Sequence, residues 1–143
     1  MGWNPWRHIG KHHPDVTVDT SVELPGRIWG LTAENRIWLC RRLDQVARRC
    51  TLTHEIVHLE RGPVPADTRG RDREERTVDA IAARRLITLD ALADALAWTR
   101  DPEQLAEALW VDVPTLHARM SGLDPVEVAE LENRLDGEWL WIP

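Results

Sequence analysis

The feature that most constrains this chain is the pentapeptide HEIVH at residues 54–58, which lies within a stretch whose apolar residues recur at helical spacing. Residues four positions apart lie on one face of a helix, one turn above the other. The two imidazoles, His54 and His58, can therefore each direct a ring nitrogen at one Zn²⁺ ion. Glu55 then lies beside the ion, where its carboxylate can take a proton from water. A match to this five-residue pattern also arises by chance, so the residues that follow it decide whether we interpret it as a metal site.

A catalytic zinc site needs a third protein ligand and a fourth position that stays open to water. The residues after the pentapeptide that can serve are Glu60, Asp67, Asp72, Glu74, Glu75, Asp79 and His117. We favour Glu75, because Asp79 follows one turn later on the same face of a predicted helix. The Asp79 carboxylate can accept the second N–H of His54 or His58 and so fix its tautomer. The alternative for Glu75 is a solvated carboxylate near the start of its helix.

The residues before the pentapeptide predict a small β-sheet. Turn-forming residues interrupt this part of the chain at Pro25-Gly26, at Gly30 and at Glu34-Asn35. The β-favouring runs between them cover residues 16–18, 21–24, 28–31 and 36–39. We expect three short strands in a mostly antiparallel sheet that packs on the helix carrying the pentapeptide.

The rest of the chain is predicted to be helical, which makes the fold class α+β. Apolar residues recur at helical spacing over residues 43–59 and again over about 73–87. The polar, Arg-rich residues 61–73 between them are expected to form a loop. Start signals for shorter helices follow at Asp101, Pro114 and Asp124.

The composition limits the remaining possibilities. A chain of 143 residues, 43% hydrophobic and 29% charged, suits one domain with a buried core. No apolar run approaches the roughly 20 residues that span a bilayer. The N-terminus has no secretory pattern, so we expect a cytoplasmic protein with no membrane partner. The net charge of −6 argues against nucleic acid as the main direct partner.

Two segments also resemble a known family. Residues 48–62, RRCTLTHEIVHLERG, and residues 73–87, REERTVDAIAARRLI, are similar to two successive helices of the ImmA/IrrE metallopeptidases. Residues 25–39 look like the sheet before the family's active helix, and residues 105–123 look like its C-terminal helix pair. The chain departs from the family's patterns at Thr53, Val78, Asp79, Ile81 and Arg85, none of which is a proposed metal ligand.

The resemblance implies a gluzincin-like minimal metallopeptidase domain over residues 1–123. Within it we expect residues 1–14 to form a loose arm. Residues 124–143 are expected to add a C-terminal helix and a Trp-containing tail.

The resemblance further implies a zinc-dependent metalloendopeptidase that hydrolyses a peptide bond in a regulatory protein. The expected substrate is a helix-turn-helix repressor, because family members are similar to phage and mobile-element antirepressors. Glu55 would activate water and return the proton to the leaving amine. Zinc is the expected metal, with Mn²⁺ or another divalent ion as the alternative.

The oxyanion of such a reaction needs a second electrophile besides the metal. The chain has no Tyr, so the candidates are His117, His12, His13 or an Arg. We select His117, because a downstream helix can fold over the cleft. The alternative for His117 is a place on the polar face of a helix over residues 114–121.

Two other functions remain open. The first is a non-proteolytic metal-containing module that binds and regulates a repressor, favoured by the lack of a clear oxyanion donor. The second is a DNA-binding regulator that uses residues 103–122 as a helix-turn-helix. Its second helix offers only His117 and Arg119 to DNA, and acidic residues lie just upstream, so we rank this function last.

Overall fold

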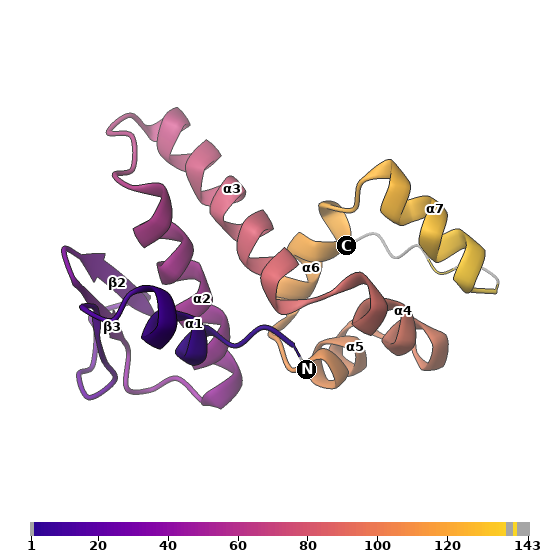
Figure 1. Ribbon diagram of the computed structural model, residues 1–143, viewed down its shortest axis with the longest axis horizontal. Helices are drawn as coiled ribbons and strands as arrows, with labels where there is room; N and C mark the ends of the chain where they lie inside the picture. Colours follow the sequence, from indigo (N-terminus) through magenta and orange to yellow (C-terminus); the bar gives the residue numbers. More distant parts are fainter. Residues whose placement is uncertain (1, 137–138, 140–143) are drawn as a thin grey trace.

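The computed structural model describes residues 2–136 and residue 139. The described residues form an α+β fold, as predicted, in which one short helix precedes a small sheet and six helices follow it (Figure 1). The strands are β1 (Thr17–Asp19), β2 (Gly30–Ala33) and β3 (Arg36–Leu39). The helices are α1 (Pro5–His12), α2 (Gln45–Arg61), α3 (Thr68–Leu86), α4 (Leu89–Trp98), α5 (Pro102–Leu109), α6 (Val113–Ser121) and α7 (Pro125–Arg134).

The sheet is mixed, which corrects the expectation of a mostly antiparallel one. Its strand order is β1-β3-β2, with β3 parallel to β1 and antiparallel to β2. Residues 21–24 form no strand, because Ser21 turns back to bond the Asp19 carboxylate through its backbone N–H at 2.8 Å. The chain then crosses over, so that β2 pairs with β3 on the side opposite to β1. This connection leaves β2 at one edge of the sheet.

Helix α2 lies between the sheet and α3 (Figure 1). Asp44 caps its start by accepting the backbone N–H of Ala47 at 2.8 Å, and Gly62 ends it with a φ of 94°, which only glycine adopts readily. Leu52 and Ile56 of α2 are fully buried in a core shared with the sheet. Val57 packs on the other side against Val78 and Ala82 of α3. Two faces of α2 are therefore buried, one against the sheet and one against α3.

The N-terminal segment is a helix, which corrects the prediction of a loose arm. Asn4 caps α1 by accepting the backbone N–H of Arg7 at 3.0 Å, and Pro5 stands at the first helical position. Ile9 is buried in the core that the sheet shares with α2. Asn4 and Pro5 are local start signals, but an isolated helix of 8 residues is marginal in water, so the order of α1 depends also on this docking.

Helices α4 to α7 enclose a second core with the end of α3. The expected start signals at Asp101 and Asp124 are helix caps, the latter a full capping box with Glu127. Helix α3 begins at Thr68, earlier than predicted, because Asp67 caps it within the Arg-rich segment. Trp139 is buried in this second core, whereas Trp141 lies outside the described residues. No helix in the described part of the chain has the length and apolarity to cross a membrane.

Candidate metal centre

The side chains of two neighbouring helices meet at one point. His54 and His58 come from α2, and Glu75 comes from α3. His54 Nε2 lies 3.1 Å from one Glu75 oxygen, and His58 Nε2 lies 2.8 Å from the other. One donor atom from each of these residues lies within 4.8 Å of the others. Two imidazole nitrogens and a carboxylate oxygen are a donor set for a divalent metal, and this arrangement fits one ion.

Asp79 engages the opposite nitrogen of His54. Its Oδ1 lies 3.0 Å from His54 Nδ1, while His54 Nε2 faces Glu75. A carboxylate on the outer nitrogen of a metal-binding imidazole fixes the ring orientation and leaves the inner nitrogen available to an ion. The other imidazole differs, because His58 Nδ1 is buried and has no hydrogen-bond partner among the described residues.

The surroundings of His54 favour positive charge. Burial lowers its pKa, but the hydrogen bond to Asp79 and the charges of Glu55, Asp79 and Glu75 outweigh this, so the pKa of His54 is raised overall. Negative carboxylates that stabilise a protonated imidazole also stabilise a cation bound next to it. The electrostatics therefore agree with the donor atoms that a positive ion is suited to this place.

Glu55 is held beside the metal centre by the sheet. Its side chain is buried, and the Thr32 hydroxyl of β2 donates a hydrogen bond of 2.8 Å to Glu55 Oε1. Strand β2 comes this close because residue 30 is glycine. A Cβ on Gly30 would lie 2.8 Å from Thr51 Cγ2, closer than real Cβ contacts, and 3.0 Å from Glu55 Cγ, which is tighter than most of them. Sequence reasoning missed both Thr32 and the packing role of Gly30, which it treated as a strand interruption.

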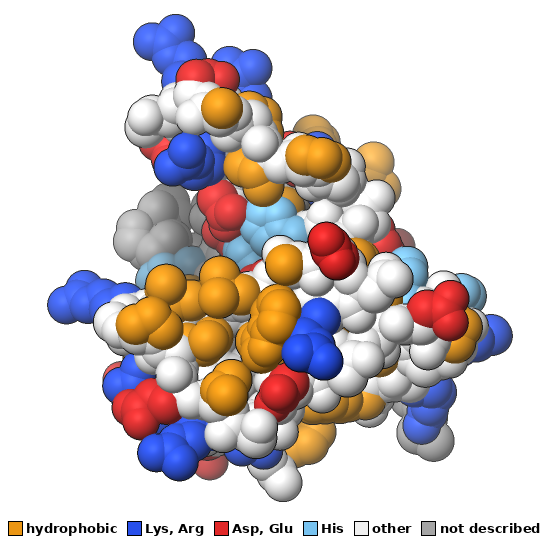
Figure 2. All heavy atoms as spheres, turned by 90° about the vertical axis from the view of Figure 1, so that its left-hand side faces the viewer, with side chains coloured by type: hydrophobic (Ala, Val, Ile, Leu, Met, Phe, Trp, Pro, Cys, Tyr) orange, Lys and Arg blue, Asp and Glu red, His pale blue; other side chains and the backbone are white. Residues whose placement is uncertain are grey.

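A cavity of about 940 Å³ opens over these residues. Its walls come from residues 27–32, from the outer face of α2, from Glu75 and Asp79, and from residues near the start of α6. Figure 2 shows a hollow on this face with histidine and acidic side chains inside it and hydrophobic side chains gathered beside it. Trp29, Leu31 and Val64 belong to the cavity wall and are about two-fifths exposed, at 45%, 43% and 39%.

His117 lies on α6, but it is not among the described residues that line this cavity. Thr115 and Ala118 of the same helix do line it. The other histidine candidates for an oxyanion donor, His12 and His13, are also absent from the described lining. The role selected for His117 stays a prediction, and the lining of the cavity lends it no support.

The α5–α6 pair is poorly suited to DNA. Arg119, the one arginine of the proposed recognition helix, is 3% exposed. It donates to Glu127 at 2.6 Å and to the backbone carbonyl of Ile87 at 2.8 Å. A recognition helix presents its basic side chains to phosphates and bases, so a guanidinium buried in this way is unavailable for that task.

Fold and site together define the class. A mixed sheet, a His-Glu-x-x-His helix and a carboxylate from the next helix make a metallopeptidase-type centre with a candidate general base. The family model of the IrrE N-terminal-like domain, a peptidase family, matches residues 15–121. The chain therefore belongs to this family of metallopeptidases, as its resemblance to ImmA/IrrE predicted. No curated protein and no solved structure gives a significant match.

Proposed function

We propose that this chain is a zinc-dependent endopeptidase that cleaves a helix-turn-helix repressor of a phage or mobile element. The observation that carries the proposal is the convergence of His54 Nε2 and His58 Nε2 on the Glu75 carboxylate, at 3.1 and 2.8 Å. Zinc is favoured over Mn²⁺ because imidazole nitrogen suits zinc, whereas manganese prefers an oxygen-rich set. The repressor as substrate rests on the family resemblance.

Each residue has a distinct task in the reaction. A divalent ion bound here supplies Lewis acidity that polarises the peptide carbonyl and acidifies water. Glu55 takes the proton from the attacking water and delivers it to the nitrogen of the leaving amine. Thr32 holds Glu55 Oε1 at 2.8 Å, which leaves Oε2 for the proton transfer. Asp79 orients His54 through Nδ1.

The substrate segment is expected to bind in an extended conformation along β2. This strand lies at the edge of the sheet and contributes to the cavity wall, so its outer backbone groups are available to a peptide. Trp29 and Leu31 beside it are exposed and apolar. We therefore expect an extended substrate with apolar side chains next to the cleaved bond.

The direct test is intact-mass spectrometry of a helix-turn-helix repressor encoded next to this chain, after incubation with the zinc-loaded protein. We expect two fragments with the wild type and none with Glu55→Gln. A matched control is Glu107→Gln, an exposed carboxylate on α5, which should cleave like the wild type. Fragments that persist with Glu55→Gln would contradict the mechanism. Cleavage of unfolded casein but of no repressor would contradict only the substrate class.

A second candidate function is binding of the repressor without cleavage. The observation that favours it is the place of His117 outside the described cavity lining, in a chain without tyrosine. Among the described residues that line the cavity, Arg27 is the one arginine that could bind an oxyanion instead. A stable complex with no fragment, formed equally by the wild type and by Glu55→Gln, would select this function.

A further inference from the structure

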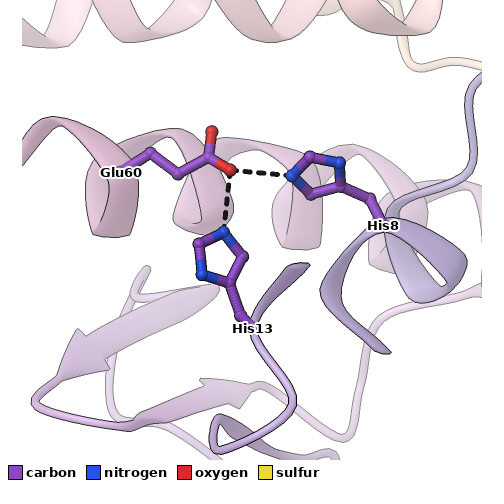
Figure 3. A group of neighbouring side chains, drawn as sticks. All are labelled: His8, His13 and Glu60. Carbon is purple, nitrogen blue, oxygen red and sulfur yellow. Dashed lines mark hydrogen bonds and ion pairs between the residues drawn. The ribbon is translucent and has the colours of Figure 1, made fainter. Parts of the chain in front are cut away.

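A second cluster of metal-binding side chains lies on a different face of α2. His8 of α1 and His13, at the end of that helix, both direct Nε2 at the same oxygen of Glu60, at 2.7 and 2.8 Å (Figure 3). One donor atom from each of the three residues lies within 4.8 Å of the others. Glu60 follows His58 by two positions, about 200° around a helix, so the two clusters face away from one another.

We propose that His8, His13 and Glu60 form a second divalent-metal site, distinct from the metallopeptidase centre. The donor set is two imidazole nitrogens and one carboxylate oxygen, which is suited to zinc. The site joins α1 to α2 and would fasten the N-terminal helix to the rest of the domain. The expected role of its ion is therefore structural.

The geometry around Glu60 resembles that of a ligand carboxylate. Arg85 of α3 donates to Glu60 Oε1 at 2.6 Å, so the other oxygen, Oε2, is left to face the two imidazoles. Hydrogen bonds of this kind, made from outside to a ligating carboxylate, orient it toward its ion. The Arg85 side chain is fixed in turn, because its guanidinium lies over the Trp3 ring at 5.5 Å.

A third imidazole lies next to the two that face Glu60. The ring of His8 lies 4.7 Å from that of His12 and 5.7 Å from that of His13, measured between centroids. One ion shared by His8, His13 and Glu60 would use the donor atoms that face one another here, because imidazole nitrogen and carboxylate oxygen both serve as metal ligands.

The two clusters differ in one respect that bears on affinity. The metallopeptidase centre has the Asp79 carboxylate beside its ligands, whereas the His8–His13–Glu60 site has the Arg85 guanidinium. A positive group next to the ligands opposes a cation, so this second site should bind zinc more weakly. A zinc titration should then show two steps, with the tighter one at His54, His58 and Glu75.

The test is a zinc titration of the full chain after chelator treatment, followed by metal analysis. The wild type should bind two equivalents, and the double variant His8→Gln/His13→Gln should bind one. In His54→Gln/His58→Gln, the remaining equivalent should be the weaker one. The matched control is His12→Gln, which removes the neighbouring imidazole that is not part of the cluster and should keep both equivalents.

Hydrogen exchange supplies a readout that does not depend on stoichiometry or on activity. Zinc should slow amide exchange in α1 of the wild type and of His54→Gln/His58→Gln, and should not do so in His8→Gln/His13→Gln. Far-UV circular dichroism checks that each variant folds. A wild type that binds one equivalent, or a second equivalent that survives His8→Gln/His13→Gln, would overturn the second site and leave the peptidase proposal intact.

Discussion

Thr32 Oγ1 donates a hydrogen bond of 2.8 Å to Oε1 of Glu55, and this contact links the edge strand of the sheet to the candidate general base. Thr32 and Glu55 are 23 positions apart in the sequence, so this contact depends on the fold. The same strand borders the cavity into which a substrate would enter. Strand β2 thus contacts the candidate general base and also borders the cavity.

Replacement of Thr32 by Val should slow the reaction without loss of the metal. Hydrogen bonds to charged groups contribute about 1.5–3 kcal/mol, so removal of this one should lower kcat/KM by roughly ten- to a hundredfold. Thr32→Ser keeps the hydroxyl and should stay close to the wild type. Steady-state cleavage of a quenched fluorescent peptide measures both variants. Equal loss in the two would mean that the methyl group matters and the hydrogen bond does not.

Replacement of Gly30 by Ala should damage the site through crowding. The new Cβ would meet Thr51 Cγ2 at 2.8 Å and Glu55 Cγ at 3.0 Å, so β2 or α2 must shift. Overpacking of this kind costs about 1–3 kcal/mol of stability, and Glu55 should lose its position as well. The midpoint temperature of thermal unfolding and the rate of peptide cleavage should both be lower than in the wild type.

Two variants isolate the cause of that effect. Thr51→Ser removes the closest obstructing methyl group, so the double variant Gly30→Ala/Thr51→Ser should regain part of the lost stability. Gly10→Ala places a methyl group in open space on α1 and should leave stability unchanged or slightly raised. Failure of Thr51→Ser to improve Gly30→Ala would show that the clash is not the source of the loss.

Replacement of Glu75 by Gln should weaken metal binding at the metallopeptidase centre. Neighbouring Glu74 is the matched control, because it pairs with Arg61 at 2.6 and 2.9 Å and is not part of the metal cluster. Metal analysis after dialysis should show loss of one equivalent in Glu75→Gln and in His58→Ala, and none in Glu74→Gln. Loss of metal in Glu74→Gln but not in Glu75→Gln would mean that Glu74, and not Glu75, is the ligand.

The sequence predicts the metal centre better than the parts that support it. His54, His58 and Glu75 with Asp79 are recognisable because the four-residue spacing within each helix is local. Thr32 and Gly30 matter only because β2 packs on α2, and no local pattern encodes that contact. Helix α1 escaped prediction for a similar reason, since Ile9 gains its burial from the sheet and α2. The parallel pairing of β1 with β3 likewise depends on where the connection crosses the sheet.

The ion pair between Arg119 and Glu127 should make the helical half of the protein sensitive to acid. The hydrogen bond from Arg119 lowers the pKa of Glu127 from 4.5 to about 2, with further bonds from the Asp124 backbone and Arg84. A carboxyl group whose pKa is lower in the folded state stabilises the fold fully above its unfolded value, near 4.5. That stabilisation is lost as the pH falls toward about 2.

Glu127→Gln should therefore destabilise the protein at neutral pH, by about 3 kcal/mol, because Arg119 stays buried at 3% exposure without a counter-charge. The difference from the wild type should shrink between pH 4.5 and 2, where the wild-type carboxylate also loses its charge. Urea unfolding at a series of pH values measures this, with the exposed Glu132→Gln on the same helix as control. A destabilisation that stays constant from pH 7 to pH 2 would show that packing, and not the charge of Glu127, holds α7 in place.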